Sequence, residues 1–222
     1  MNKTFLTGLA LVLTAVGVRA QNPETITRKG YTLTFLSNSA SFDPALKQRM
    51  IETFFKVYPV LAKDFNQNAD KAVTFSIDTA YKGVAATGGG RIVYNPEWFV
   101  KHPGDIDVVT HEVMHVVQNY GNGGGPGWLT EGIADYVRFK YGVDNPGANW
   151  TLTPFKPEQS YKNAYRITAR FLNWLETHGH KGIVVKLDNV MRTHTYKETV
   201  WKDLTGKTVD ELWAAYAANP NA

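Results

Sequence analysis

The sequence of 222 residues predicts an α+β fold, with a small sheet in its first half and helices through its second half. Segments that alternate apolar and polar residues lie before residue 95, and segments with apolar residues at helical spacing follow residue 105. The hydrophobic fraction of 43% is enough for a core. We expect residues 21–222 to form a single domain, with an α/β lobe to about residue 120 and a helical lobe from about residue 128.

The first elements are a strand, a helix and a second strand. Residues 26–36 alternate and predict the first strand. Asp43 followed by Pro44 is typical of a helix N-terminus. Pro59 should kink this helix or lie near its end. Residues 73–77 predict the second strand. The apolar residues at helical spacing are Leu46, Met50, Ile51, Phe54, Phe55, Val57, Tyr58 and Leu61.

A glycine-rich segment follows, at residues 83–94. Gly88, Gly89 and Gly90 lead into a short strand that begins with Arg91 and Ile92, and Asn95-Pro96 ends it. A glycine run before a strand indicates an exposed edge, which can pair with an extended peptide backbone. We therefore take residues 89–92 as a candidate substrate-binding edge strand. An ordinary loop and strand is the alternative.

The motif His111-Glu112-Val113-Met114-His115 lies in a helix predicted from about residue 105 to residue 120. Asp105 or Asp107 should cap its start and Gly121 its end. Residues four apart share a helix face, so His111 and His115 can bind one metal ion. Glu112 can hold a water molecule that the metal polarises. Polar residues in an apolar helix are costly unless satisfied, which favours a metal over a chance occurrence.

A catalytic zinc site needs a third protein ligand. A histidine six residues beyond His115 is excluded, because that position is Gly121. Glu131 is the remaining candidate, since a glycine loop at residues 121–127 lets the helix predicted at 128–141 fold back against the first. Asp135, one turn further, could accept a hydrogen bond from His111. The alternative is that both carboxylates face solvent.

The C-terminal part predicts three more helices, at residues 160–176, 182–192 and 208–217. Thr208 and Glu211 form a capping box for the last one. Prolines occupy the loop before the first of them. No internal repeat or low-complexity segment is found.

The first twenty residues predict a secretory signal peptide. Lys3 supplies a basic start, an apolar run follows, and Val18-Arg19-Ala20 offers a cleavage site before Gln21. An uncleaved anchor is the alternative. With no cysteine, disulfides and a lipoprotein anchor are excluded. We expect a secreted or periplasmic protein without an inhibitory propeptide.

The whole chain has 24 basic and 20 acidic residues. Removal of residues 1–20 takes away Lys3 and Arg19, which leaves 22 basic residues against 20 acidic ones and a net charge of about +2. The basic residues are scattered and form no patch. Nucleic acid and anionic membranes are therefore not expected partners. We expect a monomer.

Four stretches of the chain are distinctive: residues 111–118, residues 127–138, residues 160–165 with 168–172, and residues 206–213. Together they resemble the basic secretory protein family, described as peptidases of plants and bacteria, and the match extends over most of the mature chain. The resemblance implies a zincin-like fold: a small mixed sheet, an active-site helix and a mainly helical C-terminal lobe. The family is similar in active-site pattern to gluzincins such as thermolysin. Fifteen residues separate His115 from Glu131, fewer than in thermolysin.

The resemblance implies a peptidase with one Zn²⁺ per chain and a peptide or protein substrate, with Glu112 as general base. Tyr161, within Tyr161-Lys162-Asn163-Ala164, resembles the tyrosine that stabilises the oxyanion in zinc aminopeptidases, and Tyr165 is the second choice. Those enzymes also hold the substrate amine with a glutamate, but residues 88–94 contain no acid. This favours an endopeptidase. The alternatives are a zinc hydrolase of glycosylated or cell-wall peptides and a binding module without catalysis.

Overall fold

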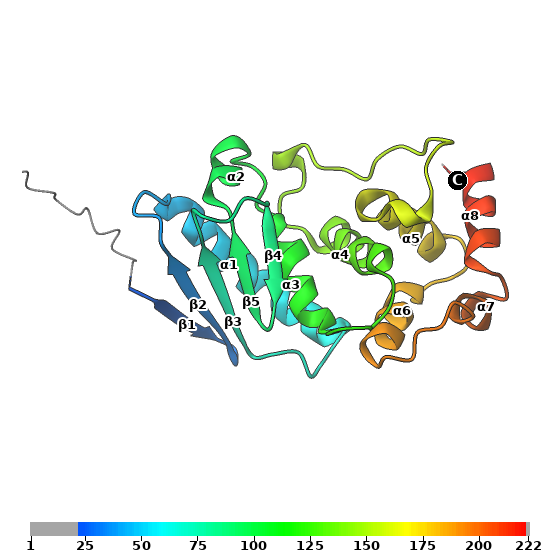
Figure 1. Ribbon diagram of the computed structural model, residues 1–222, viewed down its shortest axis with the longest axis horizontal. Helices are drawn as coiled ribbons and strands as arrows, with labels where there is room; N and C mark the ends of the chain where they lie inside the picture. The colour runs from blue at the N-terminus through cyan, green and yellow to red at the C-terminus, as the bar shows by residue number, and fades with distance from the viewer. Residues whose placement is uncertain (1–21, 221–222) are drawn as a thin grey trace, which may run out of the picture.

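A five-stranded sheet with the strand order β1-β2-β3-β5-β4 forms the N-terminal lobe of the computed structural model, which describes residues 22–220 (Figure 1). The β1–β2 and β4–β5 pairs are antiparallel, whereas β2–β3 and β3–β5 are parallel. The predicted small mixed sheet is thereby confirmed. The signal peptide expected at residues 1–20 lies outside the described residues.

The predicted first strand is in fact a hairpin of β1 (Glu24–Arg28) and β2 (Tyr31–Ser37). Lys29 and Gly30 form the two-residue turn, with φ angles of 49° and 79°. Such turns need positive φ at both positions, and glycine supplies this at little cost. The alternation continues through the turn, so it concealed the break between the strands.

The edge of the sheet next to the helices is β4 (Ala85–Gly88), and this corrects the predicted edge strand at residues 89–92. Gly89 and Gly90 are the turn, with φ angles of 55° and 71°. Arg91 and Ile92 begin β5 (Arg91–Tyr94), which lies between β4 and β3 (Ala72–Ile77). The glycines therefore reverse the chain and place the preceding residues at the edge.

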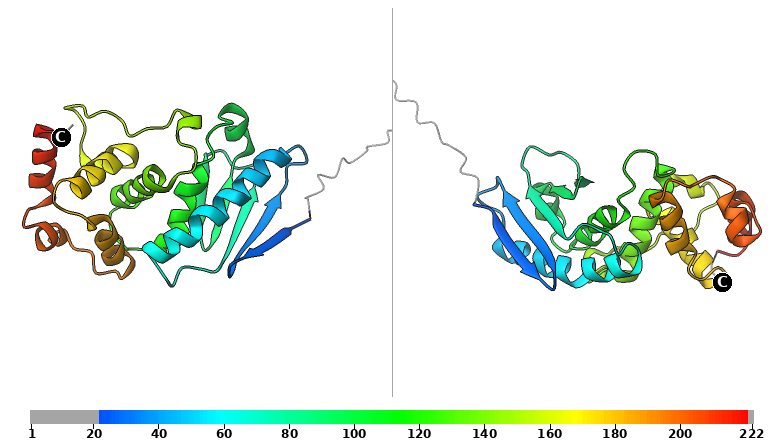
Figure 2. Two further views of the ribbon diagram at one scale, coloured as in Figure 1. Left: turned by 180° about the vertical axis from the view of Figure 1, so that it is seen from behind. Right: turned by 90° about the horizontal axis from the view of Figure 1, so that it is seen from below.

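Helix α1 (Pro44–Asp64) lies across one face of the sheet (Figure 2). The Oδ1 atom of Asp43 accepts a hydrogen bond from the backbone N–H of Ala45, as the sequence predicts for a cap. Pro59 lies within the helix, near its end. Asn95-Pro96 ends β5 as expected, but Asn95 also caps a short helix that was not predicted, α2 (Pro96–Lys101).

The helix that carries the His-Glu-x-x-His motif is α3 (Val108–Gln118), which packs between α1 and α4. It ends at Asn119, whose φ of 43° provides the left-handed cap that had been expected from Gly121. Asp107 precedes the helix but makes no side-chain cap to its N–H groups. Its carboxylate instead accepts hydrogen bonds from the N–H groups of Val143 and Asp144, which join the start of α3 to the end of α4.

Helices make up the C-terminal lobe, as predicted, and follow the glycine loop. The predicted helix at 160–176 is interrupted at Ala164, whose φ of 61° and ψ of −171° do not fit a helix. The short α7 was not predicted, whereas the capping box of Thr208 and Glu211 is confirmed. The helices are α4 (Gly127–Tyr141), α5 (Tyr165–Thr177), α6 (Ile183–Arg192), α7 (Val200–Thr205) and α8 (Val209–Ala218), with short 3₁₀ turns at Pro146–Ala148 and Tyr161–Asn163.

None of the helices within residues 22–220 is both long enough and apolar enough to cross a membrane. Aromatic side chains fill the core of each lobe. In the N-terminal lobe Phe54, Phe75 and Tyr94 are completely buried, and in the C-terminal lobe Phe171 and Trp201 are. The two lobes meet where α3 packs on α4, and this junction carries the candidate site.

Candidate metal centre

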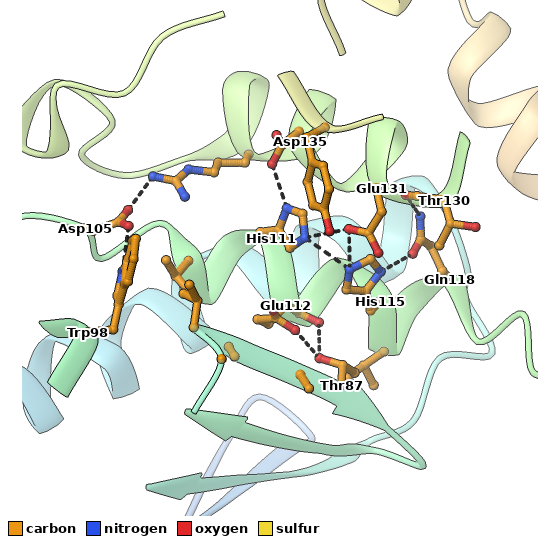
Figure 3. A pocket seen from close by; sticks show the side chains of 18 of the residues that line it. Thr87, Trp98, Asp105, His111, Glu112, His115, Gln118, Thr130, Glu131 and Asp135 are labelled. Atoms are coloured by element: carbon orange, nitrogen blue, oxygen red, sulfur yellow. Dashed lines mark hydrogen bonds and ion pairs between the residues drawn. The ribbon is translucent and has the colours of Figure 1, made fainter. Parts of the chain in front are cut away.

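Two histidines on one face of α3 and one glutamate on α4 converge at the junction of the lobes (Figure 3). The Nε2 atoms of His111 and His115 are 3.1 Å apart. The Oε2 atom of Glu131 lies 3.2 Å from Nε2 of His111 and 3.5 Å from Nε2 of His115. The structure therefore brings together the three ligands predicted from the sequence.

The helix pair explains why these residues meet. The i, i+4 spacing turns both imidazoles to the same side of α3. The glycine loop then reverses the chain, so that α4 packs along α3 with Glu131 in its second turn facing the histidines. Gly132 lets α5 approach as well, because a Cβ atom there would lie 2.2 Å from the Cγ2 atom of Thr168.

The second ring nitrogen of each histidine is also held. The Nδ1 atom of His111 is 2.7 Å from Oδ1 of Asp135, as predicted for this carboxylate. The Nδ1 atom of His115 is 2.6 Å from Oε1 of Gln118, a residue that the sequence analysis did not select. Both contacts are within the protein interior, since Asp135 is 5% and Gln118 1% exposed.

The carboxylates make this site favourable for positive charge. Burial lowers the pKa of His111, but hydrogen bonds to Asp135 and Glu131 outweigh it and raise the pKa to about 10. Burial raises the pKa of Glu131, but the two histidines more than offset this and hold it well below its usual value. A proton or a metal ion at this point would satisfy both carboxylates.

The donor set fits a zinc ion. The carboxylate of Asp135 accepts, so Nδ1 of His111 carries a proton, and in the neutral form of the ring Nε2 presents its lone pair. Nε2 faces the Glu131 oxygen at 3.2 Å and the second imidazole nitrogen at 3.1 Å, an arrangement that is favourable only when a proton or a metal ion lies among these atoms. Two imidazole nitrogens and one carboxylate oxygen form a known set of ligands for catalytic zinc.

Glu112 points from the same helix toward the sheet edge (Figure 3). It is 7% exposed, and its Oε2 atom accepts a hydrogen bond of 2.6 Å from the hydroxyl of Thr87 on β4. Thr87 was not identified in the sequence, because its role depends on the β4–β5 hairpin. The hydroxyl holds the carboxylate of Glu112 beside the metal ligands without blocking both of its oxygens.

The two candidate tyrosines have very different positions. Tyr161 is only 4% exposed, packs on Trp128 and donates its hydroxyl proton to Asp210 at 2.7 Å. This placement contradicts the first choice for an oxyanion donor, since the hydroxyl is bound to Asp210 on α8 and Tyr161 does not line the cleft that contains the metal ligands. Tyr165 is 55% exposed, lines the cleft and stacks near His111 with ring centroids 6.3 Å apart.

Backbone strain positions Tyr165. Ala164 has φ 61° and ψ −171°, a region that is occupied almost only by glycine, and Tyr165 itself has φ 47°. The negative charge of Glu131 is the main cause that raises the pKa of Tyr165, and burial raises it further. The phenol therefore stays protonated at neutral pH. A protonated phenol can donate a hydrogen bond at the metal centre.

The three metal ligands line a cleft of about 1530 Å³, together with Glu112, Thr87 and Tyr165. Its walls are the edge strand β4, helices α3 and α4, the end of α2 with the loop that follows it, the loop at residues 147–150 and the start of α5. Trp98 and Asp105 lie on one side of the metal ligands, and Gln118 and Thr130 lie on the other (Figure 3). The metal ligands are therefore in the middle of the cleft and not at a closed end.

The fold is similar to that of zinc metallopeptidases. A mutant M1 zinc metallopeptidase from Deinococcus radiodurans bound to a Tyr-Ser-Ala substrate has a TM-score of 0.55 and 16% identity, over 90% of this chain and 51% of that one. A second structure of the same mutant enzyme has a TM-score of 0.51 and 13% identity, over 92% of this chain and 52% of that one. The non-mutant form has a TM-score of 0.51 and 15% identity, over 90% of this chain and 49% of that one. The chain thus spans about half the length of these structures.

Comparison with curated protein sequences yields no match. The model of a protein family described as peptidase of plants and bacteria matches residues 17–216. This range contains all the residues of the metal centre and both lobes, as the resemblance in the sequence implied. The chain therefore belongs to the BSP family, the peptidases of plants and bacteria.

Proposed function

We propose that this protein is a secreted zinc-dependent endopeptidase. The observation that carries the proposal is the convergence of His111, His115 and Glu131 in an open cleft that also contains Glu112. Family membership supports peptide-bond hydrolysis, and the similar zincin fold supports a metal-dependent reaction. The leader-like residues 1–20 support secretion.

His111, His115 and Glu131 would hold one zinc ion. When bound, zinc lowers the pKa of a coordinated water toward ~7 and polarises the scissile carbonyl group. The carboxylate of Glu112 accepts the proton of the attacking water and delivers it to the leaving amine. Thr87 orients that carboxylate through its hydroxyl hydrogen bond. Asp135 keeps the Nε2 lone pair of His111 directed at the site.

Tyr165 is the proposed hydrogen-bond donor to the oxyanion that forms on the carbonyl oxygen when water adds to the carbonyl carbon. Its ring lies beside that of His111, and its hydroxyl proton is retained at neutral pH. A preorganised donor that interacts more strongly with the transition state than with the substrate increases the rate directly. The strained backbone at Ala164 holds Tyr165 in this orientation.

The shape of the cleft favours internal cleavage. Its lining continues past the metal ligands in both directions, so a substrate chain has room on each side of the cleaved bond. Residues 88–94 offer no carboxylate to hold a free substrate amine. The edge of β4 at residues 85–88 is available to pair with an extended substrate backbone.

A pair of fluorescence-quenched peptides tests the proposal. Both have the same internal sequence, drawn from a mixed library, and one has an acetylated N-terminus. We expect zinc-loaded protein to cleave both at similar rates, with loss of activity on chelation and recovery on addition of zinc. Cleavage confined to peptides with a free N-terminus would contradict the endopeptidase assignment. If no peptide from the library were cleaved in either form, the peptidase assignment would be contradicted.

A further inference from the structure

Gln118, the last residue of α3, connects the metal-binding histidine His115 to helix α4. We propose that Gln118 is a positioning residue of the metal centre, which fixes the tautomer of His115 and holds it in register with Glu131. The inference rests on the proposed zinc function. It adds Gln118, which lies on α3, to a site that is otherwise defined by the His-Glu-x-x-His motif and by residues of α4.

The orientation of the Gln118 amide follows from its partners. Its Nε2 atom lies 3.0 Å from the backbone carbonyl oxygen of Thr130, and a carbonyl oxygen can only accept a hydrogen bond. The amide nitrogen must therefore face Thr130. The amide oxygen is then left to face Nδ1 of His115 at 2.6 Å, so no flipped arrangement satisfies both contacts.

The tautomer of His115 follows from this orientation. Since the amide oxygen accepts, Nδ1 of His115 carries the proton, and Nε2 keeps its lone pair for the metal. Burial enforces the arrangement, because Gln118 is 1% exposed and a buried amide without partners is costly. A backbone carbonyl at the start of α4 thus determines which nitrogen of a side chain on α3 can bind a metal ion.

The same contact sets the distance between the helices at the site. Thr130 immediately precedes Glu131, and its carbonyl is held by Gln118 while the Glu131 carboxylate faces His115. His111 has an equivalent link to α4 through Asp135. The Nδ1 atom of each histidine is therefore joined to α4 through one hydrogen-bonded side chain, anionic for His111 and neutral for His115.

A matched pair of variants separates positioning from stability. Gln118→Met keeps the length of the side chain and removes both hydrogen bonds. Asn66→Leu is the control: Asn66 is 7% exposed and also donates to a backbone carbonyl of α3, that of Val117 at 2.8 Å, but it contacts no metal ligand. Both changes should lower the melting temperature of the zinc-free protein.

Zinc affinity, measured by competition with a chromophoric chelator, should fall about 10- to 100-fold in Gln118→Met and stay within about twofold in Asn66→Leu. Ring ¹⁵N shifts of zinc-free wild type in mildly alkaline buffer should place the His115 proton on Nδ1, and Gln118→Met should lose this preference. A proton on Nε2 in the wild type, or equal zinc affinity in the two folded variants, would overturn the proposal.

These readouts are distinguishable from failure of the zinc function itself. Wild-type protein that binds no zinc would contradict the proposed function, whereas the His115 tautomer of that same zinc-free protein would still decide the role of Gln118. Wild-type protein that binds zinc, beside a Gln118→Met variant that binds it equally well, would leave the peptidase intact and remove Gln118 from the metal centre.

Discussion

The two walls of the cleft contribute to the site in different ways. The N-terminal wall supplies His111, Glu112 and His115 from consecutive turns of one regular helix, with Thr87 opposite them on β4. The C-terminal wall supplies Glu131 from the neighbouring helix and Tyr165 from a strained turn. The first set is placed by helix periodicity, and the second by the packing of α4 and α5.

The candidate metal centre is therefore complete only at the junction between the lobes. Two of its three ligands belong to one lobe and the third to the other. The junction is secured by buried polar links, including those of Asp135 to His111 and of Gln118 to Thr130. A change at Glu112 should affect proton transfer, a change at a link between the walls should affect metal affinity, and a change at Tyr165 should affect transition-state stabilisation.

The largest effect is expected for Glu112→Gln on the N-terminal wall. The amide oxygen can still accept the hydrogen bond from Thr87, but the side chain can no longer take a proton from water. Peptide hydrolysis should fall by about 10²- to 10⁴-fold, while zinc content and melting temperature stay unchanged. Initial rates and metal analysis of the same samples test this, and a loss of only a few fold would exclude Glu112 as the base.

On the second wall, Tyr165→Phe should lower kcat by about 10²- to 10³-fold with little change in KM, because only the oxyanion contact is lost. Tyr161→Phe is the matched control. It should keep kcat and destabilise the protein by about 1 kcal/mol, through the hydrogen bond to Asp210. Steady-state kinetics and thermal unfolding of both variants decide between the tyrosines. The reverse pattern would restore Tyr161 as the donor.

A smaller effect is expected at the link between the walls. Asp135→Asn removes the negative charge that faces Nδ1 of His111 and should weaken zinc binding by about 10- to 100-fold. Asp210→Asn is the control, since this residue accepts from Tyr161 and contacts no metal ligand. Chelator competition measures both. Equal affinities would mean that Asp135 has no influence on the metal.

The smallest effect concerns the strain at the start of α5. Ala164→Gly removes the Cβ atom from a φ and ψ combination that costs about 1–3 kcal/mol for other residues, and part of this gain is offset by the larger entropy of unfolded glycine. A net gain of about 1 kcal/mol should raise the melting temperature by about 2–4 °C. A lower melting temperature would show that Ala164 is not strained.

The residues placed by periodicity were predictable, and those placed by irregular backbone were not. The spacing of His111 and His115 fixes their common face, and the glycine loop leads Glu131 back to it. Nothing near Tyr161 or Tyr165 indicates which of them enters the cleft, because that depends on the positive φ of Ala164. Gln118, three residues beyond His115, could have been found from helix spacing alone.

The sheet edge shows the same limit. A glycine run before a strand predicts an exposed edge at residues 89–92, whereas Gly89 and Gly90 form a two-residue turn, which is a strong hairpin signal. Residues 85–88 lack the β-branched pattern that would identify a strand, because β4 has one neighbour and is only partly buried. The tertiary pairing with β5 therefore decides its conformation.

The most direct test of a single metal centre built from both lobes is the zinc content and zinc affinity of wild type beside Glu131→Ala. Within residues 22–220, Glu131 is the candidate ligand that the C-terminal lobe brings to the group, and the variant removes it while leaving both histidines in place. We predict about one zinc per chain in the wild type and a loss or strong weakening of binding in the variant. Unchanged stoichiometry and affinity would contradict the account, because the third ligand would then lie elsewhere.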